Sequence, residues 1–397
     1  MKRYKLLNNV LGWVVFVIAA VTYILTLEST ASFWDCGEFI ASGYKLEVGH
    51  PPGNPIFMLT ARFFANFASS PSEVAYMVNL MSGLLSAATI LLLFWTITRL
   101  AQKIVLRDGE TEETMSLGQM IAILGCGLVG ALAYAWSDTF WFSAVEGEVY
   151  AYSSFCTALV FWLILKWESV ADLPHANRYI ILIAYIIGVS IAVHLLNLLC
   201  IPAIVLVYYY RKYKNTDLKG SLIALLVSFV LIVLLLYGLV PGFVEVAGWV
   251  ELLFVNVFHL PFNSGVVFYF FLIVGVIAWA IYETYAQRSD KLIKISFLIS
   301  IVLVGIPFIG DGYIIGIVLT AVLAYYLFTR KKLAVVAMNT ILLSLFVIFI
   351  GYSSYALIVI RSTANTPMDQ NSPEDIFSLG GYLNREQYGD RPLFYGQ

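Results

Sequence analysis

Charged residues are scarce in this sequence. Only 12% of its 397 residues are Asp, Glu, Lys or Arg, about half of the roughly 25% that is typical of soluble domains. Hydrophobic residues instead make up 60% of the chain. This composition excludes an ordinary soluble protein and indicates a chain that crosses a membrane several times.

An excess of basic residues is also missing, and cysteines are few. The formal net charge is −2, and without a basic face nothing favours a nucleic-acid partner. Three of the four cysteines, Cys126, Cys156 and Cys200, lie in apolar runs, whereas Cys36 stands alone in a polar stretch. This distribution gives neither a disulfide framework nor the paired spacing of a cysteine metal site.

Long apolar runs predict the membrane spans. Residues 10–27 are too many for the core of a secretory signal, and no small-residue cleavage motif follows them, so they predict an uncleaved first span. Other runs long enough to cross a hydrocarbon core of about 30 Å lie near 74–99, 117–137, 151–168, 220–240, 263–283, 295–310 and 333–352.

Two longer apolar stretches must each contain a turn. Residues 178–210 are too many for one span and are interrupted by His194 and Asn197, which predicts two short helices. The stretch 295–328 divides at Gly310-Asp311-Gly312, because glycines favour a turn and a charge is costly at the centre of the bilayer. The expected fold is therefore an all-α polytopic membrane protein with about eleven transmembrane helices.

The distribution of charge predicts the orientation, since Lys and Arg concentrate in cytoplasmic loops. With the N-terminus in the cytoplasm, 18 of the 23 basic residues fall on the cytoplasmic side. Most acidic residues then fall in outer loops, among them Glu28, Asp35, Glu38, Glu146, Glu148, Glu245 and Glu251. The predicted outer face is acidic, and the polar C-terminal segment lies outside.

The first outer loop is unusually long. It runs for about 46 residues from Glu28 to Glu73, although two to eight residues usually suffice to connect two helices. Residues 29–44 predict a helix along the membrane surface, with four apolar side chains toward lipid: Phe33, Trp34, Phe39 and Ile40. Asp35 and Glu38 then share one face of this helix, and the prolines and glycines of residues 49–55 end it.

Two further outer segments carry candidate functional groups. Residues 137–150 place Glu146 and Glu148 beside aromatic rings, for which the alternative is an aromatic belt with solvated acids. Arg361 begins the polar segment 361–397, where a guanidinium suits the phosphate of a lipid-linked donor. The alternative for Arg361 is a side chain that merely reaches toward lipid headgroups.

Several strings together resemble a known family. They are WDCGEFIA at 34–41, LEVGHPPGNP at 46–55, SAVEGEVYA at 143–151, HLLNLL at 194–199 and YLNREQYG at 382–389. They resemble a bacterial family of multi-spanning membrane proteins, common in Bacteroidetes, that is related to the eukaryotic endoplasmic-reticulum O-mannosyltransferase of plexin-type IPT domains. Asn54 and Gly147 stand where these relatives often have alanine, and neither change removes a reactive group.

The resemblance implies a GT-C glycosyltransferase fold in residues 1–360, with a polyprenyl-phosphate sugar as donor and mannose as the sugar by analogy. The acceptor would be a Ser or Thr hydroxyl of an exported protein, on the periplasmic face of a bacterial inner membrane. Residues 361–397 would begin a soluble C-terminal domain. No cofactor is required by this chemistry, although a divalent cation such as Mg²⁺ or Mn²⁺ remains an option for the outer carboxylates.

Within this chemistry Asp35 is the expected base and Glu38 its partner, because the acceptor hydroxyl must lose a proton. The expected partners of the donor and its phosphate are His50, Arg62, Glu146, Glu148, His194 and Arg361. The competing interpretation of Asp35 is a helix cap. For the whole chain the alternatives are a noncatalytic membrane scaffold and a transporter, for which His194 with Asn197 is the best feature.

The predicted topology can be tested with reporter fusions. A reporter placed after Lys332 should lie in the cytoplasm and one placed after Asn365 should lie outside, because the apolar run 333–352 separates them. Activity of a periplasm-dependent and a cytoplasm-dependent reporter at both sites measures this. The same sidedness at both positions would contradict the model.

Overall fold

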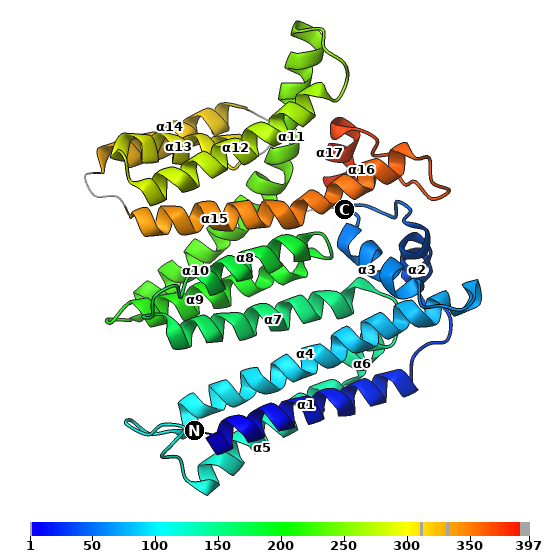
Figure 1. The fold of residues 1–397 in the computed structure, drawn as a ribbon, viewed down its shortest axis with the longest axis vertical. Coiled ribbons are helices and arrows are strands. Elements are labelled where there is room, and N and C mark those ends of the chain that lie inside the picture. The colour runs from blue at the N-terminus through cyan, green and yellow to red at the C-terminus, as the bar shows by residue number, and fades with distance from the viewer. Residues whose placement is uncertain (1, 310–312, 331–333, 390–397) are drawn as a thin grey trace, which may run out of the picture. The chain divides into compact units, whose positions relative to one another are not determined.

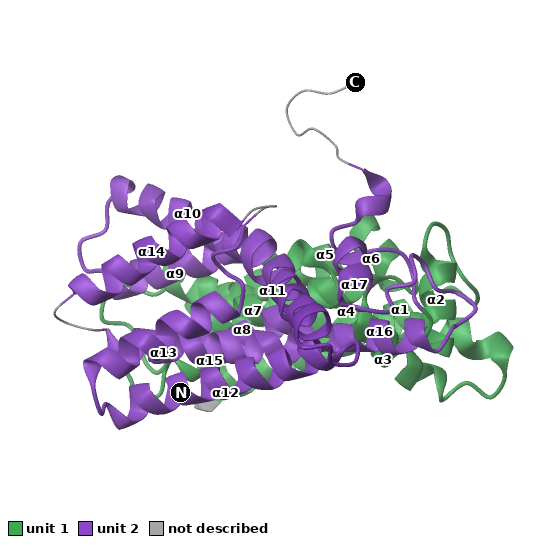
Figure 2. Ribbon diagram, turned by 90° about the horizontal axis from the view of Figure 1, so that it is seen from above, with its two compact units in different colours: residues 1–47, 54–179, 189–200 green, residues 48–53, 180–188, 201–397 purple. Residues whose placement is uncertain are grey.

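The structure is a computed structural model that describes residues 2–309, 313–330 and 334–389. Every regular element of these residues is helical, and an isolated bridge pairs Val48 with Asp369. The chain divides into two units, shown in Figure 2. The first unit holds residues 1–47, 54–179 and 189–200, and the second holds 48–53, 180–188 and 201–397.

The first unit is organised around one long helix. Its helices are α1 (Lys2–Leu25), α2 (Cys36–Lys45), α3 (Pro55–Ala65), α4 (Val74–Val105), α5 (Leu117–Ala135), α6 (Asp138–Ala144) and α7 (Val149–Val170), with 3-10 turns at Pro71–Glu73 and Leu195–Cys200. Helices α1, α5 and α7 all pack on α4 (Figure 1). Small buried side chains such as Ala19, Ala87 and Ala131 allow this close packing, which is how helices associate where lipid offers no hydrophobic driving force.

The second unit contains the remaining helices. They are α9 (Ile201–Lys212), α10 (Leu218–Val233), α11 (Val240–Leu252), α12 (Ser264–Ala286), α13 (Asp290–Leu303), α14 (Tyr313–Thr329), α15 (Val335–Tyr352), α16 (Ala356–Thr363) and α17 (Ile376–Leu383), with π turns at Leu234–Leu239 and Leu253–Val257 and 3-10 turns at Ser353–Tyr355 and Glu386–Tyr388. Helix α12 packs against α11, α13 and α15. Helix α8 (Arg178–Ile191) contributes residues to both units.

The helices confirm the all-α polytopic prediction. Among the described residues, eight helical segments are long and apolar enough to cross a membrane: Arg3–Leu25, Pro71–Val105, Leu117–Ala135, Val149–Val170, Leu195–Lys212, Leu218–Val257, Ser264–Ala286 and Val335–Thr363. The other three predicted spans correspond to α8 and α13, with 14 residues each, and α14, with 17. At 1.5 Å per residue these reach roughly 21 to 26 Å, less than a full hydrocarbon core.

The predicted turns are partly confirmed. The stretch 178–210 divides as expected, because α8 ends at Ile191 and α9 begins at Ile201. Helices α13 and α14 are separate, although Gly310-Asp311-Gly312 itself lies outside the described residues.

The segment between residues 240 and 263, which the sequence places between two spans, is not an irregular loop over most of its length, since the chain stays helical to Val257. The π turn Leu234–Leu239 comes just before Pro241 and changes the backbone register where proline lacks an N–H donor. Glu251 therefore lies in α11. Its carboxylate accepts the N–H groups of Asn263 (2.6 Å) and Val266 (3.0 Å) at the start of α12.

The surface helix predicted over residues 29–44 begins only at Cys36. Phe33 and Trp34 precede it and are exposed, as expected. The prediction that Phe39 and Ile40 face lipid is wrong. Both are buried in a cluster with Phe57 of α3, because α2 packs against α3 and α4 instead of lying alone on the membrane surface.

Candidate active site

The loop after α1 is fastened to α4 by one buried amide. Asn79 is fully buried, and its Nδ2 donates to the carbonyl oxygens of Glu28 (2.7 Å) and Thr30 (3.0 Å). The N–H of Glu28 donates in turn to the carbonyl of Val145 (3.1 Å). The segment that precedes Asp35 and the turn that precedes α7 are therefore held at the same end of the first unit.

Asp35 stands at the N-cap position of α2 without acting as a cap. Its side chain makes no capping hydrogen bond, and the residue is exposed. A carboxylate oxygen of Asp35 and one of Glu38 lie within 4.8 Å of each other. Glu38 lies in the first turn of α2, where the helix dipole favours a negative charge. The capping interpretation of Asp35 thus lacks the hydrogen bond that defines a cap.

Glu146 and Glu148 are buried, with only 5% and 6% of their surface exposed. Glu148 accepts the N–H of Val149 (2.9 Å) and caps α7. Burial raises the pKa of Glu146, and hydrogen bonds from the side chains of Ser32 and Cys36 partly offset this rise. The alternative that these two acids are solvated is wrong.

Gly147 lets this turn approach its neighbours closely. A Cβ atom at Gly147 would lie 2.9 Å from Cγ1 of Ile40 and 3.0 Å from Oδ1 of Asn79. The glycine at this position therefore fits the close packing of the turn against α2 and α4.

The four carboxylates of Asp35, Glu38, Glu146 and Glu148 form what we term the carboxylate cluster. Burial raises the pKa of the Cys36 thiol, and the charges of Glu146, Glu148 and Asp35 raise it further. The phenol of Tyr150 is within the electrostatic reach of the same three acids. Residues from two distant parts of the sequence thus share one electrostatic environment.

His194 lies next to this cluster. Its ring centroid is 5.4 Å from that of Tyr150, and its Nδ1 accepts the N–H of Leu196 (3.2 Å). Because Nδ1 accepts, the neutral imidazole carries its proton on Nε2 and can donate it to an oxygen of a ligand.

Arg62 makes a structural contact with Tyr44. Its guanidinium donates to the backbone carbonyl of Tyr44 and lies over the Tyr44 ring, 5.3 Å from the ring centroid. This contact joins α3 to the end of α2. A role of Arg62 toward the donor phosphate remains a prediction.

His50 belongs to the segment Val48–Gly53 of the second unit. The N–H of Val48 donates to Met368 (3.0 Å), and the carbonyl of Val48 accepts from Gln370 (3.1 Å). The hydroxyl of Tyr382 donates to the carbonyls of Gly49 (2.7 Å) and His50 (3.3 Å). These bonds fix the backbone that carries His50.

Arg361 lies in the last turn of α16, where the helix dipole favours a cation. The next residue, Ser362, donates to Oδ2 of Asp369 (3.0 Å), and Asp369 is bridged to Val48. The second unit therefore ties the helix end that carries Arg361 to the segment that carries His50. The sequence alone predicts no role for Asp369 or Tyr382, because their contacts with Val48, Gly49 and His50 join residues more than 300 positions apart.

These features define a multi-pass helical membrane protein with a carboxylate cluster at one end of its first unit. Residues 35–217 match the family model described as Protein O-mannosyl-transferase TMEM260 N-terminal domain. The mouse Protein O-mannosyl-transferase TMEM260 is 27% identical over 209 residues, which are 53% of this chain and 27% of that protein. The Dictyostelium discoideum protein of the same name is 23% identical over 189 residues, 46% of this chain and 20% of that protein.

The comparisons confirm the resemblance to the eukaryotic O-mannosyltransferases. The chain spans only about a quarter of the length of the curated relatives that it matches, and no solved structure matches it. The range 35–217 contains all four acids of the carboxylate cluster as well as His50, Arg62 and His194, whereas Arg361 lies outside it.

The raised pKa of Glu146 predicts how this residue affects stability. A carboxyl group whose pKa rises on folding stabilises the protein at low pH, and this contribution is lost as the pH rises through the folded-state pKa. Glu146→Gln stays neutral, so its melting temperature in detergent should exceed that of the wild type at pH 8 and approach it at pH 4. The exposed Asp138→Asn at the same end of the unit is the control. A Glu146→Gln protein less stable than the wild type at pH 8 would contradict this.

Proposed function

We propose that this protein transfers a sugar, mannose by analogy, from a polyprenyl-phosphate donor to a Ser or Thr hydroxyl of an exported protein. The names of both relatives support a protein O-mannosyltransferase-like activity. The observation that carries the proposal is the position of Asp35. It is an exposed acid at the head of α2, makes no capping bond, and lies beside buried carboxylates within the matched range.

The reaction needs one base and one stabilised leaving group. The acceptor oxygen attacks the anomeric carbon of the sugar, the bond from that carbon to the phosphate oxygen breaks, and polyprenyl phosphate leaves. Asp35 takes the hydroxyl proton, and Glu38, within 4.8 Å, orients it. The buried Glu146 and Glu148 hold the turn that lines the same end of the unit.

The leaving phosphate needs hydrogen-bond donors. In the proposal Arg361 supplies a planar guanidinium that can bind two phosphate oxygens, and His50 assists it. His194, whose Nδ1 accepts the N–H of Leu196, and Arg62, whose guanidinium donates to the carbonyl of Tyr44, are the further candidates for this role.

A divalent cation remains part of the proposal as an option. The carboxylate oxygens of Asp35 and Glu38 are of the type that Mg²⁺ and Mn²⁺ prefer, and they lie close enough to share an ion. The base mechanism of Asp35 does not require one, so we propose no essential cofactor.

The proposed location is a bacterial inner membrane with the N-terminus in the cytoplasm and the carboxylate cluster facing the periplasm. The excess of Lys and Arg at the other helix ends supports this orientation. The four carboxylates then lie on the side where exported acceptor proteins emerge.

One contact argues against the transporter alternative. The side-chain oxygen of Asn197 accepts from the hydroxyl of Thr157 (3.2 Å) and from the thiol of Cys200 (3.4 Å). Asn197 thereby joins the 3-10 turn Leu195–Cys200 to α7. This favours a structural role over a transport site for Asn197.

The role of Asp35 is tested with Asp35→Asn. Asn keeps the size of the side chain but removes the base, so turnover should fall by roughly 10²-fold or more while donor binding is retained. Asp138→Asn, an exposed acid of α6 at the same end, should transfer normally. Near-normal transfer by a correctly inserted Asp35→Asn protein would contradict the assignment of Asp35 as the base. Glu146 or Glu148 would then be the candidate base.

The role of Arg361 is tested with Arg361→Lys and Arg361→Ala. Lysine keeps the charge but loses the two-point contact, so the KM for the donor should rise by roughly tenfold, and alanine should cost more. Arg385→Lys is the matched control in the same unit. If donor affinity and turnover both survive in Arg361→Ala, the phosphate is bound elsewhere.

A further inference from the structure

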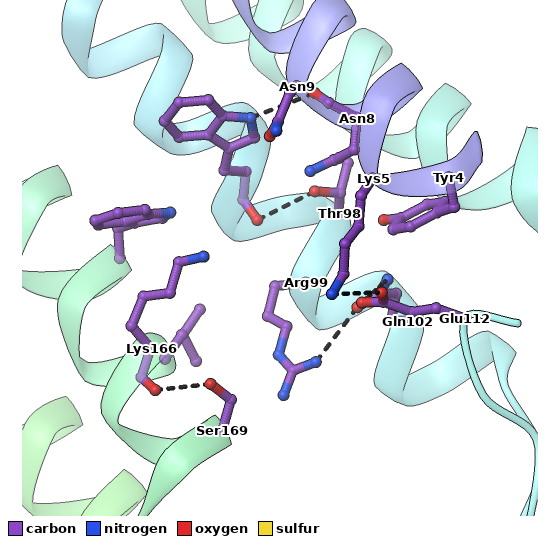
Figure 3. A pocket seen from close by; sticks show the side chains of 13 residues that line it. Tyr4, Lys5, Asn8, Asn9, Thr98, Arg99, Gln102, Glu112, Lys166 and Ser169 are labelled. Atoms are coloured by element: carbon purple, nitrogen blue, oxygen red, sulfur yellow. Dashed lines mark hydrogen bonds and ion pairs between the residues drawn. The ribbon is translucent and has the colours of Figure 1, made fainter. Parts of the chain in front are cut away.

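A second candidate site lies at the other end of the first unit. A cavity of about 460 Å³ opens where α1 begins and where α4 and α7 end (Figure 3). The carboxylate cluster lies where α1 ends and α4 and α7 begin. Since α1 has 24 residues and rises 1.5 Å per residue, roughly 36 Å separates its two ends. The cavity therefore belongs to none of the sites described above.

The walls of this cavity are mainly cationic. Lys5 from α1, Arg99 from α4 and Lys166 from α7 line it, and Glu112 is the acid that lines it among the described residues. The ammonium of Lys5 lies 3.7 Å from Glu112. Arg99 donates to Gln102 (3.4 Å), and its guanidinium lies 3.9 Å from the carboxylate of Glu168. Three cations converge from three helices on one hollow, which is a favourable setting for an anion.

Glu168 does not cancel this charge. It forms its closer ion pair with Lys103, so the four cations Lys5, Arg99, Lys103 and Lys166 outnumber the two acids Glu112 and Glu168. These six groups therefore keep a net positive charge when their ion pairs are counted.

Aromatic and amide groups complete the cavity. The rings of Trp95 and Trp162 are 5.8 Å apart, and the ammonium of Lys166 lies 4.8 Å over Trp162. Oδ1 of Asn8 is buried and has no hydrogen-bond partner among the described residues. A buried acceptor in this position calls for a donor, such as a hydroxyl or ammonium group of a ligand.

An exposed apolar face of α1 continues from the cavity, and we term this face the groove. It is a shallow hollow that runs from Asn9 to Ile18, and its lining residues all belong to α1, among them Val10, Trp13, Val14 and Val17. Asn9 borders both hollows. The groove extends for roughly 14 Å along the helix. A cationic cavity beside an exposed apolar helix face suits a molecule with an anionic headgroup and an apolar chain.

We propose that the cavity and the groove together bind one phosphate-bearing lipid. Its phosphate is held by Lys5, Arg99 and Lys166, a hydroxyl or ammonium of its headgroup donates to Asn8, and one of its chains follows α1. A phospholipid and a polyprenyl phosphate share this chemistry. The abundance of Lys and Arg at this end matches the membrane face where anionic lipids attract basic residues. The inference does not depend on the proposed transfer reaction.

Native mass spectrometry of the full chain tests this site. The purified protein, delipidated in a neutral detergent, is titrated separately with phosphatidylglycerol, polyprenyl phosphate and phosphatidylcholine. One equivalent of phosphatidylglycerol or polyprenyl phosphate should stay bound in preference to phosphatidylcholine, and the lipid that binds more tightly identifies the natural source. Arg99→Gln combined with Lys166→Gln should weaken this binding by roughly 10- to 100-fold, because each removes a charged hydrogen bond.

Two further variants test the contributions of charge and of the groove separately. Arg178→Gln combined with Lys219→Gln removes the same charge at two residues that do not line the cavity, so this protein should bind lipid like the wild type. Val14→Trp fills the groove at an exposed position of α1, so it should weaken lipid binding while a folded first unit is retained.

Three results would overturn the inference. The first is equal lipid retention in the wild type and the Arg99→Gln, Lys166→Gln protein. The second is equal loss in the Arg178→Gln, Lys219→Gln control, which would indicate only bulk lipid held by charge. The third comes from a competition in which inorganic phosphate is added to the lipid-bound protein. Complete displacement of the lipid by phosphate, together with unchanged lipid binding in Val14→Trp, would assign the cavity to a soluble phosphate compound.

Discussion

The geometry of the first unit depends on the hydrogen bonds of Asn79. A side-chain amide buried in an apolar helix is costly unless its donors are bonded. The Nδ2 group of Asn79 meets this cost by donating to the carbonyls of Glu28 and Thr30. The loop after α1 cannot leave α4 without stranding this donor, so the segment that leads to Asp35 stays fixed. The bond from Glu28 to Val145 extends the constraint to the turn that carries Glu146 and Glu148.

The same unit separates its charges along the helix direction. Carboxylates gather where α1 ends, and Lys5, Arg99 and Lys166 gather where it begins. Ionisable groups are expensive in hydrocarbon, so both groups lie at helix ends where water and headgroups are available. Burial of Glu146 at one of these ends is therefore a stability cost that a purely structural loop would avoid, and it points to function.

Much of this organisation could be predicted from the sequence because the bilayer allows few solutions. Apolar length determines which segments can be spans, and only helices satisfy their own backbone in lipid. The fold class and the division at residues 178–210 followed from this rule. The helical extension to Val257 did not follow from this rule, since Pro241 suggests the end of a helix. Only the π turn before Pro241 shows how the helix continues.

The site was predictable only where its residues are close in sequence or carry the family resemblance. Asp35 and Glu38 are one helical turn apart, which predicts their shared face. The roles of Asn79 and Tyr382 depend on partners about 50 and more than 300 residues away, and no local pattern reveals such contacts. Lys5, Arg99 and Lys166 served only as markers of topology in the sequence, because their convergence arises from the packing of α1 and α7 on α4.

The most direct measurement is transfer by the purified full-length protein. Reconstituted in liposomes, it would be given polyprenyl-phosphate mannose or a nucleotide-linked mannose together with an exported acceptor protein, and the acceptor mass would be read. Transferase function predicts one added hexose on a Ser or Thr, with the lipid-linked donor only, and release of polyprenyl phosphate. Absence of transfer from every lipid-linked sugar, together with binding of a solute that an ion gradient drives across the membrane, would contradict it.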